Sequence, residues 1–252
     1  MSIERIFTVF IRPALRKLGI DITRYQGSTL PRDFDELNRR IYNAVKDYTM
    51  TSPERVNALT EAVRYIIHEN IAGALVECGV WKGGSVMAMA LTLKEMGAVR
   101  EIYLYDTFSG MPAPSEDDGE RAKKFFNKYR VSKDSSRWLF SPLEEVQKNL
   151  AQTRYPAETF HFIQGRVEDT IPENIPEKIS LLRLDTDFYA STKHALTYLF
   201  PLLSPKGIII LDDYGCWKGA KKAVDEYIQE NKLCIYLHRI DDQGRMAIKM
   251  PD

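Results

Sequence analysis

The chain has 252 residues, with 35 Lys and Arg against 35 Asp and Glu, so its formal net charge is zero. Because such a chain has no electrostatic attraction for long polyanions, nucleic acid is not an expected partner. Hydrophobic residues make up 44% of the sequence, enough for a buried core, and the length suits one α/β domain with an extension.

The three cysteines, Cys78, Cys216 and Cys234, show no paired spacing, so they predict neither a disulfide framework nor a zinc site. A reducing compartment fits this pattern. Apolar runs stay well short of the roughly 20 residues that span a bilayer, and charged residues interrupt the apolar positions near the N-terminus. The sequence therefore predicts a soluble cytoplasmic protein.

Residues 1–48 are predicted to form a helical N-terminal extension. Apolar residues at steps of three and four over 2–18 describe one helical face, which Pro13 would kink. Basic residues among them would let this helix lie on a membrane surface. Packing on the domain or on a partner subunit is the favoured interpretation, and a homodimer is expected. A linker is predicted over 26–34 and a second helix over 35–47.

A further helix is predicted from Pro53 onward, because Ser52 is a good N-cap and proline suits the first helical position. From residue 74 strands and helices alternate. This alternation predicts an α/β, Rossmann-like domain over 49–252, with a mainly parallel seven-stranded sheet and helices on both faces. The predicted strands cover 74–78, 101–105, 160–164, 181–184, 207–211, 234–237 and 246–249, and the predicted helices cover 83–96, 143–152, 191–203 and 220–231.

The stretch Thr107–Phe140 breaks this alternation. It shows no clear period and contains Gly110, Pro112 and Pro114 among many charges. A loop of this length inside a compact domain is usually functional or disordered. Since it follows a strand end at the predicted active edge, we expect a lid over the active site.

The sequence Glu77-x-Gly79-x-x-x-Gly83 follows an apolar strand and precedes a helix. Glycines there let the backbone approach a ligand closely, and the start of a helix offers free N–H groups. The spacing differs from the dinucleotide pattern G-x-G-x-x-G. It resembles the first motif of class I methyltransferases, which faces the amino-acid end of S-adenosylmethionine. A plain tight turn is the alternative interpretation.

Two further loops follow strand ends. Asp106 ends the second strand, where a carboxylate can accept both ribose hydroxyls of a nucleoside, and capping of a turn is the alternative. The loop Gln164–Asp169 follows the third strand, where class I methyltransferases border the adenine ring. Asp169 could equally cap the next short segment.

Four carboxylates end two successive strands of the predicted sheet. Asp185 and Asp187 follow one strand, and Asp212 and Asp213 follow the next. Because parallel strands end at the same edge, these groups would repel one another and raise each other's pKa values. A divalent cation removes this conflict, and Mg²⁺ prefers oxygen ligands. Separate, solvated caps of the two strands are the alternative interpretation.

Together these stretches resemble the macrocin O-methyltransferase family, whose members methylate sugar hydroxyls of antibiotics. The resemblance runs from about Thr49 to the C-terminus. It departs from the family at Thr186, where relatives usually have glycine. Related catechol-type enzymes carry a lysine base at the position of Phe188, so a mechanism of that type is not expected. The matching stretches are Glu77–Ser85, Tyr105–Pro112, Asp185–Tyr189 and Asp212–Gly215.

The resemblance implies a role for each of these positions. Asp185, Asp212 and Asp213 would bind Mg²⁺. The acceptor's proton would pass to a carboxylate, for which Asp185 is the first candidate and Asp187 the second. S-adenosylmethionine would be held by Met50, Thr51, Ser52, Glu77, Cys78, Gly79, Gly83, Ser85, Asp106, Thr107, Gln164, Gly165, Arg166, Asp169 and Asp185.

The predicted function is therefore S-adenosylmethionine- and Mg²⁺-dependent O-methylation of a sugar hydroxyl. Because two adjacent hydroxyls could chelate the cation, a vicinal diol is the expected acceptor, on a glycosylated natural product, a polysaccharide or a glycolipid. The alternatives are a non-sugar small-molecule hydroxyl and a methyltransferase fold kept as a binding or assembly module. The glycine spacing and the carboxylates argue against a third alternative, a nicotinamide-dependent dehydrogenase.

Overall fold

The computed structural model describes residue 15 and residues 30–251. The chain divides into two compact units, residues 1–33 and residues 34–252. The helix predicted over 2–18 belongs to the first unit and, apart from Leu15, lies outside the described residues. No helix among the described residues is long and apolar enough to cross a membrane.

The strands of the described residues form one sheet. They are β1 (Ala74–Cys78), β2 (Ile102–Asp106), β3 (Phe160–Gln164), β4 (Ile179–Leu184), β5 (Leu203–Leu211), β6 (His238–Arg239) and β7 (Arg245–Ile248). Their order is β3-β2-β1-β4-β5-β7-β6. β1 to β5 are parallel, and β7 runs antiparallel to both of its neighbours. The predicted mainly parallel, seven-stranded, Rossmann-like sheet is confirmed.

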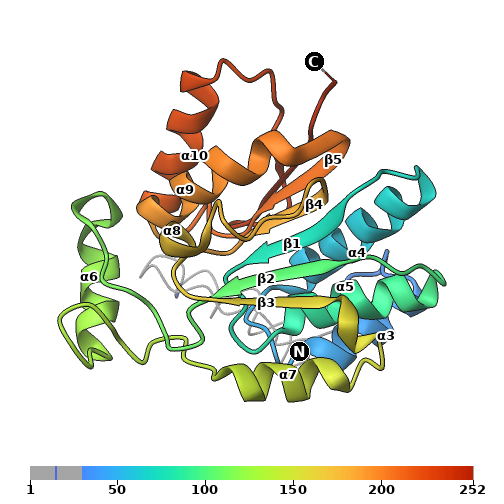
Figure 1. The fold of residues 1–252 in the computed structure, drawn as a ribbon, viewed down its shortest axis with the longest axis horizontal. Helices are drawn as coiled ribbons and strands as arrows, with labels where there is room; N and C mark the ends of the chain where they lie inside the picture. Colours follow the sequence, from blue (N-terminus) through green and yellow to red (C-terminus); the bar gives the residue numbers. More distant parts are fainter. Residues whose placement is uncertain (1–14, 16–29, 252) are drawn as a thin grey trace, which may run out of the picture. The chain divides into compact units, whose positions relative to one another are not determined.

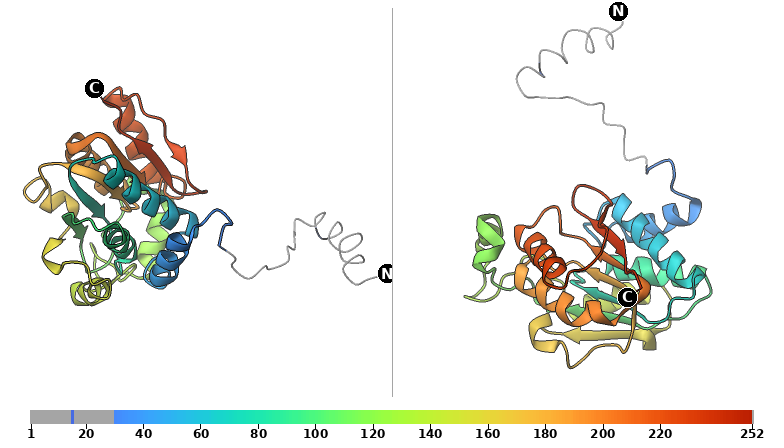
Figure 2. Two further views of the ribbon diagram at one scale, coloured as in Figure 1. Left: turned by 90° about the vertical axis from the view of Figure 1, so that its right-hand side faces the viewer. Right: turned by 90° about the horizontal axis from the view of Figure 1, so that it is seen from above.

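Helices cover both faces of this sheet, as predicted (Figures 1 and 2). They are α3 (Glu36–Val45), α4 (Pro53–His68), α5 (Gly84–Glu95), α7 (Leu143–Ala151), α8 (Val167–Thr170), α9 (Tyr189–Leu199) and α10 (Lys218–Glu230). A further helix, α6 (Gly119–Lys128), lies beyond the edge of the sheet at which β1 and β2 end. One buried cluster joins the sheet to α3, α4, α5 and α7, and a second joins it to α8, α9 and α10. Leu75 belongs to the first cluster and Val76 to the second, because successive side chains of a strand point to opposite faces.

The helices α3 and α4, which precede β1 in the chain, pack into the core of the sheet domain. α4 begins as predicted, since the Ser52 hydroxyl accepts the amide of Arg55 and a proline occupies the first position. In α3, Ile41 and Val45 are buried in the cluster that contains α4 and α5. Residues 34–48 therefore pack with the sheet domain, whereas the sequence places the start of that domain at residue 49. Apolar spacing over one short helix does not reveal which surface the helix packs against.

The helix predicted over 191–203 is shorter than expected. α9 ends at Leu199 and is followed by a single 3₁₀ turn that contains Pro201. Proline offers no N–H for the next helical hydrogen bond. β5 therefore begins earlier than predicted, at Leu203.

The first strand of the final hairpin is displaced along the chain, while its turn lies at Asp241–Gly244. A strand is predicted over 234–237, but β6 lies at His238–Arg239. The Ile240 amide donates to the Gly244 carbonyl at 3.1 Å, which closes a tight turn. That turn fixes which residues face β7, so the pairing starts after the predicted strand.

The stretch expected to be an aperiodic loop contains the helix α6. Ala122 and Phe126 are its buried residues, and they lie four positions apart, on one face. The two ends of the stretch come together, because Pro112 forms an isolated β-bridge with Ser135. In Figure 1 the arrowheads of β1 and β2 point toward α6, so the stretch lies at the carboxyl edge of the sheet.

Asp118 joins this stretch to the start of α9. Its carboxylate accepts the amide and the hydroxyl of Ser115 at 2.7 Å each, and the amide of Tyr189 at 2.6 Å. Gly219 of α10 lies so close that a Cβ there would be 1.9 Å from Asp118 Oδ1. A cluster of aromatic rings adds to the contact with α9 and α10: Phe125, Trp138, Phe188 and Trp217.

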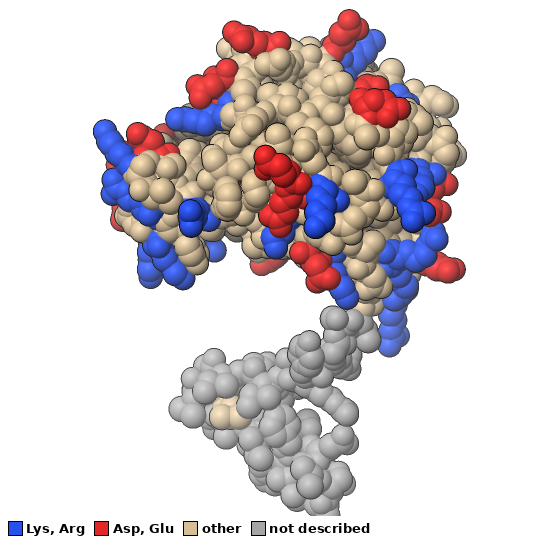
Figure 3. All heavy atoms as spheres, turned by 60° about the horizontal axis from the view of Figure 1, so that its bottom comes forward, with Lys and Arg blue, Asp and Glu red and all other residues tan. Residues whose placement is uncertain are grey.

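Charges of both signs share the surface. Figure 3 shows Lys and Arg side chains interspersed with Asp and Glu side chains over one face. Several of them form exposed ion pairs, such as Lys221 with Asp225 and Arg64 with Asp35. Exposed pairs of this kind contribute little to stability, about 0–1 kcal/mol each.

Candidate active site

The ends of the central parallel strands surround one cavity. Residues that end or follow β1, β2, β4 and β5 line it, represented by Gly79, Asp106, Asp185 and Asp212. Its volume is about 1090 Å³, counting the open mouth. The cavity lies at the carboxyl ends of parallel strands, where open α/β sheets bind their ligands.

The glycine loop after β1 approaches two other parts of the chain closely. Gly79 has a φ of +87°, and a Cβ there would lie 1.8 Å from the carbonyl oxygen of Asp185. At Gly84, a Cβ would lie 2.6 Å from the carbonyl carbon of Tyr48. Gly83 does not line the cavity, and a Cβ there would lie 3.2 Å from Cγ1 of Val146.

Asp106 both lines the cavity and caps the glycine loop. Its Oδ2 accepts the amides of Val80 at 2.6 Å and Trp81 at 3.0 Å, and its Oδ1 accepts the amide of Phe108 at 2.8 Å. Burial raises the pKa of Asp106, although these amides act in the opposite direction. Capping of the turn and contact with a ribose are thus compatible roles for Asp106. The hydrogen bonds that shape the glycine loop also hold the carboxylate at the cavity wall.

Glu77 is a buried carboxylate with one open acceptor. Its Oε1 contacts Arg183 Nη1, while its Oε2 has no hydrogen-bond partner among the described residues. Burial raises the pKa of Glu77 to about 8, and the charge of Arg183 opposes that rise. Since Glu77 also lines the cavity, the open oxygen fits a ligand that brings N–H donors, such as the ammonium group of S-adenosylmethionine.

Three carboxylates lie close enough together to share one cation. Oxygen atoms of Asp185, Asp212 and Asp213 all lie within 4.8 Å of one another. Asp212 and Asp213 are buried, while the Asp185 side chain is 32% exposed. An all-carboxylate set with an open side suits a hard divalent cation such as Mg²⁺, which keeps some of its waters. The residues present therefore fit the predicted metal site.

Asp187 lies beside this cluster. Its amide donates to Asp213 Oδ2 at 3.0 Å, and its φ of 57° is in the left-handed region. Burial, together with the charges of Asp185 and Asp212, raises the pKa of Asp187 well above its usual range. Burial and the neighbouring carboxylates raise the pKa of Asp213 in the same way. These like charges need a counter-charge, as the sequence predicts.

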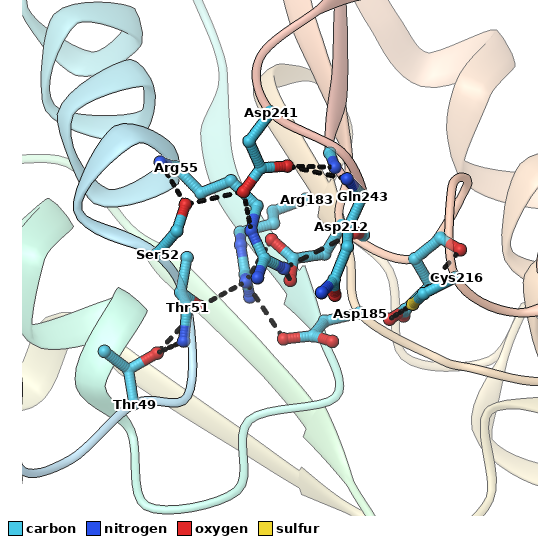
Figure 4. A network of polar contacts seen from close by, with 12 residues as sticks. Thr49, Thr51, Ser52, Arg55, Arg183, Asp185, Asp212, Cys216, Asp241 and Gln243 are labelled. Atoms are coloured by element: carbon cyan, nitrogen blue, oxygen red, sulfur yellow. Dashed lines mark hydrogen bonds and ion pairs between the residues drawn. The ribbon is translucent and has the colours of Figure 1, made fainter. Parts of the chain in front are cut away.

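A buried arginine, absent from the sequence prediction, lies beneath these groups (Figure 4). Arg183 of β4 faces Glu77 of β1 in the sheet register. Its Nη2 lies 2.9 Å from Asp185 Oδ2 and 2.6 Å from Asp212 Oδ1. Although burial alone would lower the pKa of Arg183, these carboxylates raise it well above its usual value. The signal in the sequence was a charged residue within a strand that is otherwise apolar except for Ser180.

The other predicted cofactor residues divide into two groups. Met50, Thr51, Ser85, Thr107, Gly165 and Arg166 line the cavity. Ser52, Cys78, Gln164 and Asp169 do not: Ser52 caps α4, and Cys78 is fully buried in the core. The cavity also has lining residues to which the sequence analysis assigned no role, and these include Tyr48, Thr49, Trp81, Met111, Leu139 and Gln243.

A family model for macrocin O-methyltransferases (TylF) matches residues 27–247. The chain belongs to this family. It is 31% identical over 199 residues to a mycinamicin III 3''-O-methyltransferase from Micromonospora griseorubida, covering 78% of this chain and 76% of the relative. It is 32% identical over 200 residues to an 8-demethyl-8-(2,3-dimethoxy-alpha-L-rhamnosyl)-tetracenomycin-C 4'-O-methyltransferase from Streptomyces olivaceus, covering 78% and 74%.

The same relationship appears among solved structures. The O-methyltransferase NovP superposes with a TM-score of 0.74 and 30% identity, over 81% of this chain and 83% of that chain. The resemblance drawn from the motifs is confirmed. The protein is thus an S-adenosylmethionine-dependent O-methyltransferase.

Proposed function

We propose that this methyltransferase acts on a sugar hydroxyl and uses a divalent cation, Mg²⁺, held by Asp185, Asp212 and Asp213. One observation carries the proposal: a single cavity is lined both by the glycine loop and by these carboxylates. One matched relative is named for a rhamnosyl-bearing acceptor, which supports a sugar. A vicinal diol suits the site best, because two adjacent oxygens can approach one cation.

The chain's own residues can place the two reactants next to each other. Gly79 and Asp185 are in backbone contact, so the methionine end of the cofactor and the carboxylate cluster share one wall. Holding both reactants in line supplies much of the rate in a methyl transfer. A bound cation supplies Lewis acidity toward a neighbouring hydroxyl. Asp185 has the more exposed side chain, so it is our first candidate to take the hydroxyl proton, and Asp187 is the second.

The cofactor part of the proposal is tested by calorimetric titration of S-adenosylmethionine into the wild type and Asp106→Ala. We expect the variant to bind at least about tenfold more weakly, since it loses a charged hydrogen-bond acceptor at the cavity wall. Asp169→Ala is the matched control, because Asp169 follows β3 without lining the cavity. Unfolding curves check that both variants fold. Equal affinities in all three proteins would remove Asp106 from the cofactor site.

The acceptor and the cation are tested by methyl transfer to glycosides with and without vicinal hydroxyls. With EDTA we expect a loss of about 100-fold or more for the diols, restored by Mg²⁺, since metal activation supplies several kcal/mol. Turnover that is unchanged in EDTA would refute the metal role. Turnover of a phenolic alcohol in preference to every glycoside would favour the non-sugar alternative.

We infer that Thr107–Phe140 acts as a lid. Support comes from both ends of the stretch, since Gly110, Met111, Pro112 and Leu139 line the cavity. The homodimer, the cytoplasmic location and the membrane contact of residues 2–18 stay predictions from the sequence. Light scattering tests whether the protein is a homodimer. Vesicle co-sedimentation, with and without residues 1–20, tests the membrane contact.

A further inference from the structure

A second buried arginine, Arg55 in the first turn of α4, joins three parts of the chain (Figure 4). Its Nη1 contacts Asp212 Oδ2, and its Nε lies 3.0 Å from Asp241 Oδ2. Asp241 belongs to the turn between β6 and β7, and Asp212 follows β5. Arg55 therefore holds a proposed metal ligand and the final hairpin against the start of α4.

The segment Tyr48–Ser52 leads into α4 and contacts the same groups. Tyr48 to Thr51 line the cavity. Thr51 Oγ1 accepts a hydrogen bond from Arg183 Nη2 at 3.2 Å. Ser52 Oγ donates to Asp241 Oδ2 at 2.6 Å and accepts the Arg55 amide at 3.1 Å. A ligand that packs against this segment therefore also restrains the position of Arg55.

The orientation of Asp212 depends on both arginines. Arg183 contacts its Oδ1, and Arg55 contacts its Oδ2. A carboxylate has about four acceptor positions on its two oxygens, so Asp212 can still accept a cation in this arrangement. The arginines then decide whether its free lone pairs face Asp185 and Asp213.

We propose that Arg55 is a positioning residue that couples the binding of S-adenosylmethionine to the binding of the divalent cation. The inference rests on the proposed function. Cofactor in the cavity restrains Tyr48–Ser52, that segment fixes Arg55, and Arg55 fixes Asp212. By linkage the effect is reciprocal: each ligand raises the affinity of the other by the same factor. We expect a factor of about 5 to 150, the usual range for such coupling.

A residue with a merely structural role would not make the affinity of one ligand depend on the binding of the other. If Arg55 were only a structural ion pair, its loss would lower the stability of the protein and weaken the binding of both ligands. The factor by which one ligand raises the affinity of the other would stay unchanged. Lysine cannot substitute for it, because a single ammonium group does not reach Asp212 and Asp241 with the planar geometry of a guanidinium. The coupling factor therefore separates positioning from stability.

The experiment is a set of calorimetric titrations on the full chain. Mg²⁺ is titrated without cofactor and with saturating S-adenosylhomocysteine, in the wild type and in Arg55→Gln. Arg64→Gln is the matched control, since Arg64 lies on the same helix but forms exposed ion pairs with Asp35 and Glu61. Asp241→Asn is a second test if Arg55→Gln does not fold, because it removes one partner of Arg55 and keeps the metal carboxylates.

We expect a coupling factor of about 5 or more in the wild type and in Arg64→Gln. In Arg55→Gln the coupling factor should fall to within about twofold of one. In Asp241→Asn it should be at most about half of the wild-type value. A factor near one in a wild type that binds both ligands overturns the coupling and leaves the proposed function standing. Coupling that persists in Arg55→Gln removes Arg55 from this role. A wild type that binds no cofactor refutes the proposed function itself, and one that binds no cation refutes both its metal role and the coupling.

Discussion

Gly79 lies where two loops of the active site meet. Its positive φ and the nearby carbonyl of Asp185 leave no room for a side chain. Gly97, at the end of α5, also has a positive φ, of +64°, but a Cβ there would meet nothing within 4 Å. The two glycines share one kind of backbone conformation and differ in crowding.

We expect Gly79→Ala to lower the free energy of unfolding by several kcal/mol and to abolish binding of S-adenosylmethionine, because the loop must move away from Asp185. Gly97→Ala should cost only about 1 kcal/mol, the backbone strain alone. Urea unfolding and cofactor titration measure both effects. Similar losses in the two variants would show that strain, and not the close approach, fixes the glycine loop.

Asp241 provides a test of pH dependence. Burial alone would raise the pKa of Asp241, but the Ser52 hydroxyl, the amides of Gln243 and Gly244 and the charge of Arg55 lower it below its usual value. The stabilisation is therefore fully present above the unfolded value of about 3.9 and is lost as the pH falls through the folded value.

We expect Asp241→Asn to be less stable than the wild type by roughly 1–3 kcal/mol at pH 7, with a difference that shrinks below about pH 4. Denaturant unfolding across this range measures it. A difference that stays constant down to pH 3 would mean that the carboxylate charge has no part in holding the hairpin.

Among single residues, those at strand ends could be predicted from the sequence, because the strand and glycine patterns show where each strand ends. Asp106, Asp185, Asp212 and Asp213 all line the cavity as expected. Arg183 escaped prediction, since its partners Glu77 and Asp212 are distant in sequence and meet it only through the strand order. A charged residue in a mostly apolar strand is a local signal, but it does not show which residues the charge will meet.

Among the elements, α6 has the least obvious sequence signal. Charged residues surround its two buried positions, Ala122 and Phe126, so the apolar stripe is too short to stand out. Its contact with α9 depends on Asp118, whose carboxylate reaches both Ser115 and Tyr189.

We expect Asp118→Ala to release this stretch. Trypsin should then cleave within residues 121–137 at least about tenfold faster, because cleavage follows the population of the opened segment. Asp117→Ala is the control, since Asp117 forms a partly exposed ion pair with Lys222. Mass spectrometry identifies the cleaved bonds. Equal rates in the two variants would show that Asp118 does not hold the stretch in place.

On the scale of the molecule, the cavity is built within one unit. Its lining residues run from Tyr48 to Gln243, and the division between the units follows Asp33. Alternating strands and helices predicted this α/β architecture, while the packing of α3 moved the unit boundary toward the N-terminus.

We expect a chain of residues 34–252 to fold and to bind S-adenosylmethionine within about threefold of the full protein, since a compact unit with its own core can fold alone. Calorimetry on the truncated and full chains checks this. Loss of binding by a folded truncation would show that residues 1–33 contribute to the cofactor site.

The pairing of Glu77 with Arg183 has a consequence for how the chain reaches its native state. β1 and β4 are buried on both faces and are otherwise nearly all apolar, so they lack the in-and-out alternation that sets strand alignment in half-exposed sheets. A slip of one residue would leave two opposite charges buried apart, at a cost of several kcal/mol. The same ion pair that lies beneath the active site thus selects one alignment of the central strands from the misaligned ones available during folding.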